Sequence, residues 1–163
     1  MTMGTADELP GAESLADEIS RLVRERGLSV ATAESLTGGK IACQLAVAQA
    51  SSEWFAGSVV AYLSRVKYDV LKVPVGPVIS EECAAAMAKG VADLLGADLT
   101  IAVTGVGGPD EEEGQPPGTV WFGVCADGET RTELQLFSGD PAETVDRTTD
   151  RALRLLLDRL TGS

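Results

Sequence analysis

The sequence contains no histidine, and this absence excludes several kinds of active site. A Ser-His-Asp triad, a Cys-His dyad and a zinc site with histidine ligands all require an imidazole. If the protein is a hydrolase, another side chain must act as the base. Basic residues are also scarce, because 13 lysines and arginines stand against 25 acidic residues, a net charge of −12. Such an acidic surface repels nucleic acids and anionic membranes, so we expect neither as a partner.

Cysteines are few and dispersed, at positions 43, 83 and 125. They cannot form a CxxC metal or redox motif, and the apolar surroundings of Cys43, Cys83 and Cys125 predict buried free thiols in a reducing compartment. Long apolar runs are missing as well, so no membrane span is expected, and the acidic segment 1–20 does not resemble a signal peptide. We therefore expect a cytoplasmic protein, and 163 residues suit a single domain.

Helical and strand-like patterns alternate along the chain. Residues 1–11 are small and polar, which predicts a frayed or disordered N-terminus ahead of a domain over 12–163. Helices are expected at 12–26, 38–49, 64–72, after Ser80 and after Asp140, and strands at 29–33, 57–63, 99–103, 119–125 and 131–137. The turn Asp127-Gly128 predicts a hairpin between the last two strands. This order predicts a layered α/β/α domain with a mixed, partly parallel sheet.

The last two helices have predictable starts and apolar faces. Ser80 and Asp140 are expected N-caps, the latter in a capping box with Glu143. The expected buried faces are Cys83, Met87, Val91, Leu94 and Leu95 in the first of these helices, and Val145, Thr149, Ala152, Leu153, Leu156 and Leu160 in the second.

Two glycine-rich segments follow expected strands, where open α/β sheets bind ligands. In the first, Ser35 and Thr37 precede Gly38 and Gly39, and the free amides of a helix start could hold an oxyanion or a phosphate. Alternatively, the two hydroxyls only cap the helix. The GxxxxGK[ST] spacing is absent, so Walker-type ATP binding is not expected. The second segment is either another ligand loop or a plain turn, and contains Thr104, Gly105, Gly107 and Gly108.

Tyr62 and Lys67 lie where an expected strand leads into a helix. A lysine can act as the base for a serine if burial, or a cation such as Arg65, lowers its pKa, and a tyrosine can relay a proton. The alternative is a solvated lysine and a half-buried tyrosine. The four consecutive acids 110–113 predict a solvated loop rather than a metal site, because consecutive side chains do not converge on one ion.

Together these segments resemble the C-terminal domain of the competence/damage-inducible protein CinA, the nicotinamide-nucleotide amidohydrolase family. The resemblance covers residues 12–160. It is carried by Ala33-Glu34-Ser35-Leu36-Thr37-Gly38-Gly39, Ser51-Ser52-Glu53-Trp54-Phe55, Val60-Ala61-Tyr62 with Lys67, Thr104-Gly105-Val106-Gly107-Gly108-Pro109, Pro117-Gly118-Thr119-Val120-Trp121 and Phe137-Ser138-Gly139-Asp140. The larger N-terminal domain of full CinA proteins is not in this sequence, so the resemblance is to the stand-alone form.

The resemblance implies deamidation of nicotinamide mononucleotide to nicotinate mononucleotide and ammonia, a step of pyridine nucleotide recycling that uses no cofactor and no metal. It implies Ser35 as the nucleophile, assisted by Tyr62 and Lys67. Substrate binding is then expected at both glycine-rich segments and at a basic residue near the last helix, namely Thr37, Gly38, Gly39, Thr104, Gly105, Gly107, Gly108 and Arg147. Whether the chain forms a homo-oligomer stays open.

Several positions depart from the usual family pattern. Leu36 replaces a common cysteine, Leu63-Ser64 replace Ser-Asn, and the stretch 73–80 is shorter than usual. Gln115 stands in place of a lysine, and Val145 in place of an arginine for which Arg147 is the nearest substitute. The last two changes remove positive charge that could serve a phosphate. The alternative reading is therefore a nucleotide-binding module that keeps the fold but has lost turnover.

Overall fold

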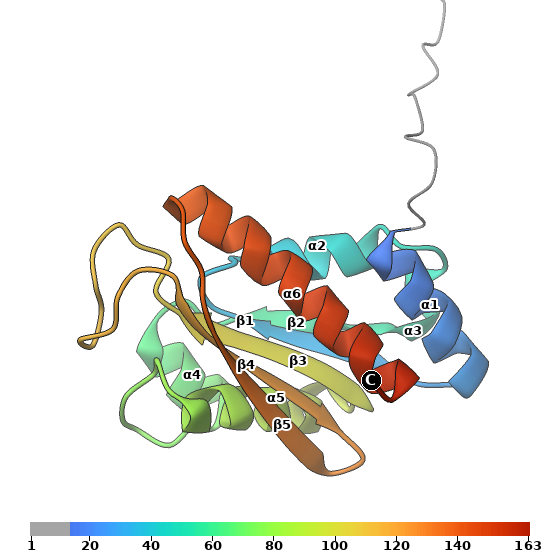
Figure 1. Ribbon diagram of the computed structural model, residues 1–163. Coiled ribbons are helices and arrows are strands. Elements are labelled where there is room, and N and C mark those ends of the chain that lie inside the picture. The colour runs from blue at the N-terminus through green and yellow to red at the C-terminus, as the bar shows by residue number, and fades with distance from the viewer. Residues whose placement is uncertain (1–13) are drawn as a thin grey trace, which may run out of the picture.

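A computed structural model describes residues 14–163, and the predictions for residues 1–11 lie outside this part. Five strands form one sheet in the order β2-β1-β3-β4-β5 (Figure 1). Strands β1 (Val30–Glu34), β2 (Phe55–Val60) and β3 (Leu99–Gly105) are parallel, whereas β4 (Thr119–Ala126) and β5 (Glu129–Leu136) form the predicted antiparallel hairpin. The mixed sheet confirms the expected fold class.

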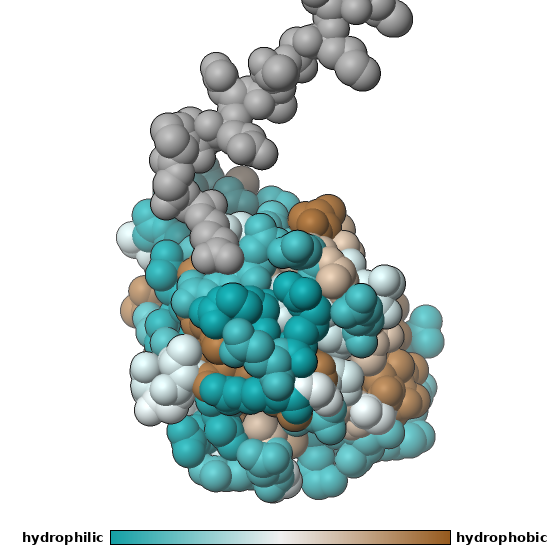
Figure 2. Space-filling view, turned by 90° about the vertical axis from the view of Figure 1, so that its right-hand side faces the viewer, coloured by the Kyte–Doolittle hydropathy of each residue, from teal (hydrophilic) through white to brown (hydrophobic). Residues whose placement is uncertain are grey.

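Helices cover both faces of the sheet (Figure 1). On one face lie α1 (Leu15–Arg26), α2 (Lys40–Ala46), α3 (Ser51–Trp54) and α6 (Pro141–Thr161), and on the other α4 (Ser64–Leu71) and α5 (Glu81–Leu95). Each layer has its own core: Ile19 and Phe122 are buried in the first, Leu71 and Met87 in the second. Of the helices in residues 14–163, none is long and apolar enough to cross a membrane. The view in Figure 2, a quarter turn from Figure 1, shows a mostly hydrophilic surface.

The helix starts follow the predicted caps. Ser80 Oγ accepts a hydrogen bond from the Cys83 amide at 3.2 Å, and Asp140 Oδ1 accepts one from the Glu143 amide at 2.8 Å. The helix expected over 38–49 is shorter, because Gly38 and Gly39 adopt positive φ angles of 58° and 106° and α2 starts only at Lys40. The short helix α3 was not predicted.

Four predictions of burial were wrong, among them that of Leu95, which is only half-buried near the end of α5. Cys43 is exposed, because α2 turns Ile41 and Leu45, one turn apart, toward the core. Leu94 is also exposed near the end of α5. Val145 is only half-buried, since α6 buries Thr144 and Thr148 instead, and Thr148 Oγ1 donates to the Thr144 carbonyl at 2.7 Å. Cys83 and Cys125 are buried free thiols, as expected.

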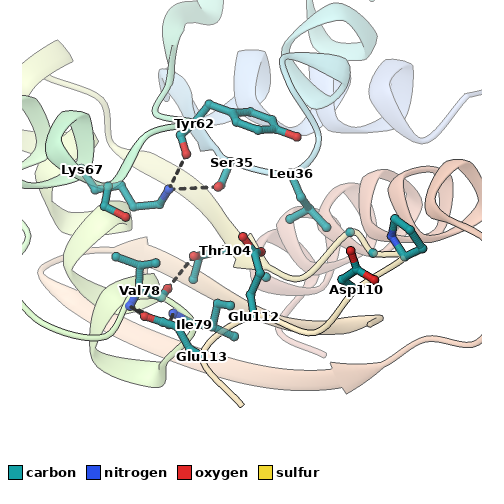
Figure 3. Close-up of a pocket in the computed structure, with 15 residues that line it drawn as sticks. Ser35, Leu36, Tyr62, Lys67, Val78, Ile79, Thr104, Asp110, Glu112 and Glu113 are labelled. Atoms are coloured by element: carbon teal, nitrogen blue, oxygen red, sulfur yellow. Dashed lines mark hydrogen bonds between the residues drawn. The ribbon is translucent and has the colours of Figure 1, made fainter. Parts of the chain in front are cut away.

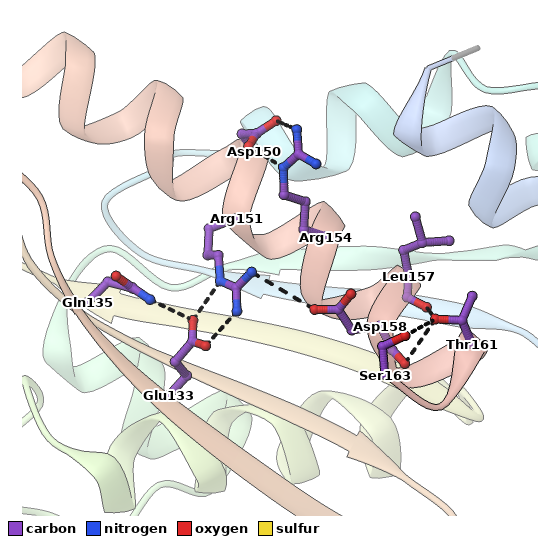
Figure 4. A network of polar contacts seen from close by, with 9 residues as sticks. All are labelled: Glu133, Gln135, Asp150, Arg151, Arg154, Leu157, Asp158, Thr161 and Ser163. Carbon is purple, nitrogen blue, oxygen red and sulfur yellow. Dashed lines mark hydrogen bonds and ion pairs between the residues drawn. The ribbon is translucent and has the colours of Figure 1, made fainter. Parts of the chain in front are cut away.

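An ion pair joins α6 to the outer strand β5 (Figure 4). Arg151 donates two hydrogen bonds to Glu133, from Nε at 2.7 Å and from Nη2 at 2.6 Å. Gln135 Nε2 also donates to Glu133, at 3.1 Å. These hydrogen bonds, that of Arg151 first, lower the pKa of the Glu133 carboxyl. The pair therefore fastens the C-terminal helix over the edge of the hairpin.

Gly90 determines how closely α4 approaches α5. A Cβ atom at Gly90 would lie 2.0 Å from the carbonyl oxygen of Leu71, the last residue of α4. No side chain fits in that space, so glycine permits direct contact between the backbones of the two helices. Leu71 follows Lys67 by one helical turn. The contact at Gly90 thus holds the end of α4, one turn after Lys67, directly against α5.

Candidate active site

A cavity of about 530 Å³ opens at the carboxyl ends of the parallel strands. The segment after β1 contributes Ser35 and Leu36, and the segment after β2 leads into α4. The other residues that line the cavity are Tyr62, Ser64, Lys67, Val78, Ile79, Thr104, Gly105, Gly107, Gly108, Pro109, Asp110, Glu112 and Glu113. Open α/β sheets bind ligands at this edge, so the topology alone makes the cavity the candidate site.

Ser35 and Lys67 meet in this cavity although 32 residues separate them (Figure 3). Lys67 Nζ donates to Ser35 Oγ at 3.0 Å and to the Ala61 carbonyl at 2.6 Å, with a longer contact of 3.4 Å to the Tyr62 carbonyl. The Lys67 residue is 2% exposed and Ser35 is 8% exposed. The structure therefore brings together the predicted nucleophile and its predicted base.

The surroundings of Lys67 favour a neutral amine. Burial is the main cause that lowers the pKa of Lys67 below its ordinary value, while Cys83, Glu112 and Glu113 oppose the shift. A neighbouring cation such as Arg65 was expected to contribute, but burial dominates. Within residues 14–163, Lys67 has no ion-pair partner. The direction of the shift is the one that a lysine base requires.

The partners of Lys67 suit both of its protonation states. A neutral amine has two N–H donors for the carbonyls of Ala61 and Tyr62, and one lone pair that can accept the Ser35 hydroxyl proton. An ammonium has three donors for the same three oxygens. Proton transfer between Ser35 and Lys67 therefore needs no rearrangement of the hydrogen-bond partners.

Glu34 is a residue that sequence reasoning missed. Its side chain is completely buried, and its carboxylate accepts from Thr37 Oγ1 at 2.7 Å and from the amides of Ile41 and Ala42, each at 2.9 Å. These bonds close the turn that contains Ser35 and satisfy the free amides at the start of α2. An acidic residue shortly before a helix start was the available signal, because such a carboxylate can cap the helix.

Several predicted binding residues lie away from the cavity. Thr37 directs its hydroxyl to Glu34, and Gly38 and Gly39 do not line the cavity. Arg147 does not line it either, since its guanidinium donates to Ser138 Oγ at 3.2 Å and lies 3.7 Å from the Glu143 carboxylate. Tyr62 lines the cavity but is 66% exposed, and the contact to Lys67 comes from its backbone carbonyl.

The second glycine-rich segment does line the cavity. Thr104 Oγ1 donates to the Val78 carbonyl at 2.6 Å, so this hydroxyl supports the opposite loop. A Cβ atom at Gly105 would lie 2.4 Å from the Thr119 carbonyl, which explains the glycine by the close approach of β4. Within the described residues, the amides of Gly107 and Gly108 have no hydrogen-bond partner. These two amides are available to a ligand.

Three carboxylates from one loop form the remaining wall of the cavity. Glu113 accepts hydrogen bonds from the amides of Val78 and Ile79, at 3.0 Å and 2.6 Å, and so anchors the segment 73–80. In the part of the chain that the structure describes, the side chains of Asp110 and Glu112 have no hydrogen-bond or ion-pair partner. No group of three or more carboxylates or thiols suited to a metal ion occurs in residues 14–163.

Known proteins share both the sequence and the fold. Competence-damage inducible proteins of Bacillus subtilis (strain 168) and Bacillus velezensis are 40% and 36% identical over 131 and 152 residues. Those matches cover 77% and 90% of this chain but only 32% and 36% of the relatives, so the chain spans about a third of their length.

Solved structures match over nearly their whole length. Crystal structures of CinA-superfamily proteins from Klebsiella pneumoniae 700603 and Escherichia coli are each 33% identical, with a TM-score of 0.87. They cover 91% and 94% of this chain, which in turn covers 97% and 92% of theirs. The CinA C-terminal domain family matches residues 12–160. The fold, the sequence identity and this match together show that the chain belongs to the CinA C-terminal domain family.

Proposed function

We propose that this chain hydrolyses the carboxamide of nicotinamide mononucleotide to the carboxylate and ammonia, as a cytoplasmic enzyme that needs no metal or cofactor. The observation that carries the proposal is the 3.0 Å contact between Lys67 Nζ and Ser35 Oγ inside the cavity. A buried amine with a lowered pKa beside a hydroxyl is an arrangement that activates a nucleophile without histidine.

The first half of the proposed reaction forms an acyl-enzyme. The neutral Lys67 amine takes the Ser35 proton while Oγ attacks the carboxamide carbon. Backbone amides stabilise the resulting oxyanion, each donor contributing roughly 3–4 kcal/mol. The unpaired amides after Ser35, at Leu36 and Thr37, and those of Gly107 and Gly108 are the candidates within residues 14–163. The Lys67 ammonium then returns its proton to the leaving nitrogen, and ammonia departs.

The second half regenerates the serine. Water attacks the ester carbon, Lys67 accepts a proton from this water, and the carboxylate product leaves as Ser35 Oγ is reprotonated. Tyr62 remains a candidate assistant: its ring lies at the mouth of the cavity, where the hydroxyl could orient the substrate or a water molecule (Figure 3).

The departures from the family pattern at Gln115 and Val145 keep a second candidate open, a nucleotide-binding module that has lost turnover. Arg147 and Lys40 are both engaged by carboxylates, Lys40 Nζ lying 2.9 Å from Asp146 Oδ1, and neither residue lines the cavity. A phosphate therefore has few cations to bind. The paired Ser35 and Lys67 nevertheless favour the enzyme, because a module needs no buried amine.

The test is ammonia release from nicotinamide mononucleotide by the purified protein. Ser35→Ala should reduce turnover by at least about a thousandfold with an unchanged thermal transition. Ser64→Ala is the matched control, since Ser64 lines the same cavity but is not among the hydrogen-bond partners of Lys67 Nζ, and it should keep most of the activity. Near wild-type turnover by Ser35→Ala would contradict the nucleophile assignment. Mononucleotide binding without ammonia release by the wild type would favour the binding module.

A further inference from the structure

The charged groups that line the cavity are mainly acidic. Among residues 14–163, three carboxylates line it, at Asp110, Glu112 and Glu113, whereas Lys67 is the one basic lining residue. Lys67 is 2% exposed and its Nζ is directed to the oxygens of Ser35, Ala61 and Tyr62, so it offers a ligand little direct contact. The cavity therefore presents a negative potential to an incoming substrate.

The three carboxylates are not equivalent. Glu113 is held by the amides of Val78 and Ile79, which leaves little of its charge for a ligand. Glu112 and Asp110 have no side-chain partner within residues 14–163. Figure 3 shows the Glu112 carboxylate pointing toward Ser35 and Leu36, while Asp110 lies farther to the side. Glu112 is thus the unpaired carboxylate aimed at the predicted reacting atoms.

This placement discriminates between two kinds of aromatic carboxamide. A pyridine ring whose nitrogen carries a glycosyl or alkyl group is a permanent cation, whereas a free pyridine or a dihydropyridine carboxamide is neutral at pH 7. A carboxylate beside the ring stabilises the cation and gives nothing comparable to the neutral ring. The same carboxylate repels a phosphate, which must then point toward the mouth of the cavity.

We propose that Glu112 is a specificity-determining residue that selects carboxamides on a permanently cationic ring, with a smaller contribution from Asp110. The proposal rests on the proposed function, because it assumes that the carboxamide faces Ser35. It deepens that function by assigning to one side chain the recognition of the substrate's positive charge. The loop that carries Glu112 then selects the substrate that binds in the cavity, and Ser35 and Lys67 carry out the chemical step on its carboxamide.

Binding of two small probes tests the proposal separately from catalysis. 1-Methylnicotinamide, which is methylated on the ring nitrogen, and nicotinamide share the ring and the carboxamide, but only the first is a cation. Their dissociation constants should be measured by calorimetry with the wild type, Glu112→Gln and Glu111→Gln. Glu111 is a neighbouring acid that does not line the cavity, so its variant controls for the general loss of one negative charge.

The wild type should prefer the cationic probe, and Glu112→Gln should reduce this preference by about fivefold, the size expected for one exposed charge pair. Glu111→Gln should leave it within about twofold. An equal preference in all three proteins, or equal losses in both variants, would overturn the proposal. Absence of ammonia release from nicotinamide mononucleotide, with the preference intact, would instead defeat only the proposed function.

Discussion

The two walls of the cavity differ in how completely their polar groups are paired. Behind the wall that Ser35, Leu36 and Lys67 line, Glu34 is fully buried with three strong hydrogen bonds, and within this wall Ser35 contacts Lys67. In the opposite wall, Asp110 and Glu112 are exposed, and the structure gives their side chains no partner within residues 14–163. Satisfied networks hold reacting atoms in place, whereas exposed loops can vary without loss of the fold. In the proposed function, the chemistry thus belongs to the first wall and the selectivity to the second.

After Ser35→Ala, the largest expected loss of turnover comes from replacing Lys67, the proposed base. Lys67→Arg keeps a positive charge, but a guanidinium cannot give up its proton at any useful pH. We expect turnover to fall by at least about a hundredfold at every pH from 6 to 10, a typical contribution of a general base. Steady-state ammonia assays check this. Substantial activity of Lys67→Arg would mean that the lysine only supplies charge.

The next effect is on stability. Glu34→Gln replaces one carboxylate oxygen by an amide nitrogen, so a donor would face one of the donors Thr37 Oγ1, Ile41 N and Ala42 N. An unsatisfied buried donor destabilises by roughly 1–3 kcal/mol, and we expect a loss of about 2 kcal/mol in the free energy of unfolding. Thr37→Val removes only one of these bonds and should lose about 1 kcal/mol. Urea denaturation of the three proteins measures both losses. Equal stability of all three would show that the Glu34 bonds contribute nothing.

The pH dependence of turnover should depend on residues of both walls, Lys67 in one and Glu112 in the other. Turnover should rise with pH as Lys67 loses its proton, and the limb should lie below the ordinary lysine value of 10.5 because burial lowers this pKa. The carboxylate of Glu112 raises the pKa of Lys67. Glu112→Gln should therefore move the limb to lower pH, and Glu111→Gln should move it less. A pH–rate profile measures the shift. A limb that moves to higher pH in Glu112→Gln would contradict the assigned sign.

The smallest effect on the free energy of unfolding is expected from the ion pair between α6 and β5, whose residues do not line the cavity. Arg151 and Glu133 form a bidentate pair, but their side chains are still 30% and 29% exposed. Such a pair contributes at most about 1 kcal/mol. Arg151→Met should therefore lower the unfolding free energy by no more than that and leave turnover unchanged (Figure 4). A change in turnover would show that the position of α6 affects the residues of the cavity.

The sequence predicted most of the fold because its periodic patterns agree with the final packing. Alternating helices and strands, the caps at Ser80 and Asp140 and the turn at Asp127-Gly128 all describe local structure. The short helix α3 has only four residues and therefore no measurable period. Cys43 was misplaced because α2, at seven residues, is too short for its apolar face to be identified from spacing.

The site was predicted less completely than the fold, because residue spacing describes local structure and not contacts between distant side chains. The family resemblance implied that Ser35 and Lys67 act together, and they meet in the structure because the parallel strands that precede them end at one edge of the sheet. The partners of Thr37 and Arg147 depend on side-chain contacts that spacing does not contain, and both residues turned out to bond within the protein. Whether Ser35, Tyr62 and Lys67 are catalytic stays a prediction.

The close contact at Gly90 has a consequence for anyone who screens variants of this protein. Gly90 does not line the cavity, yet a methyl group there would push α4 outward, and Lys67 would retreat from Ser35 with it. If the proposed activity is present, a random library scored by ammonia release should therefore identify position 90 as sensitive, although Gly90 would touch no substrate. The distance between Ser35 and Lys67 then depends on a helix–helix contact outside the cavity.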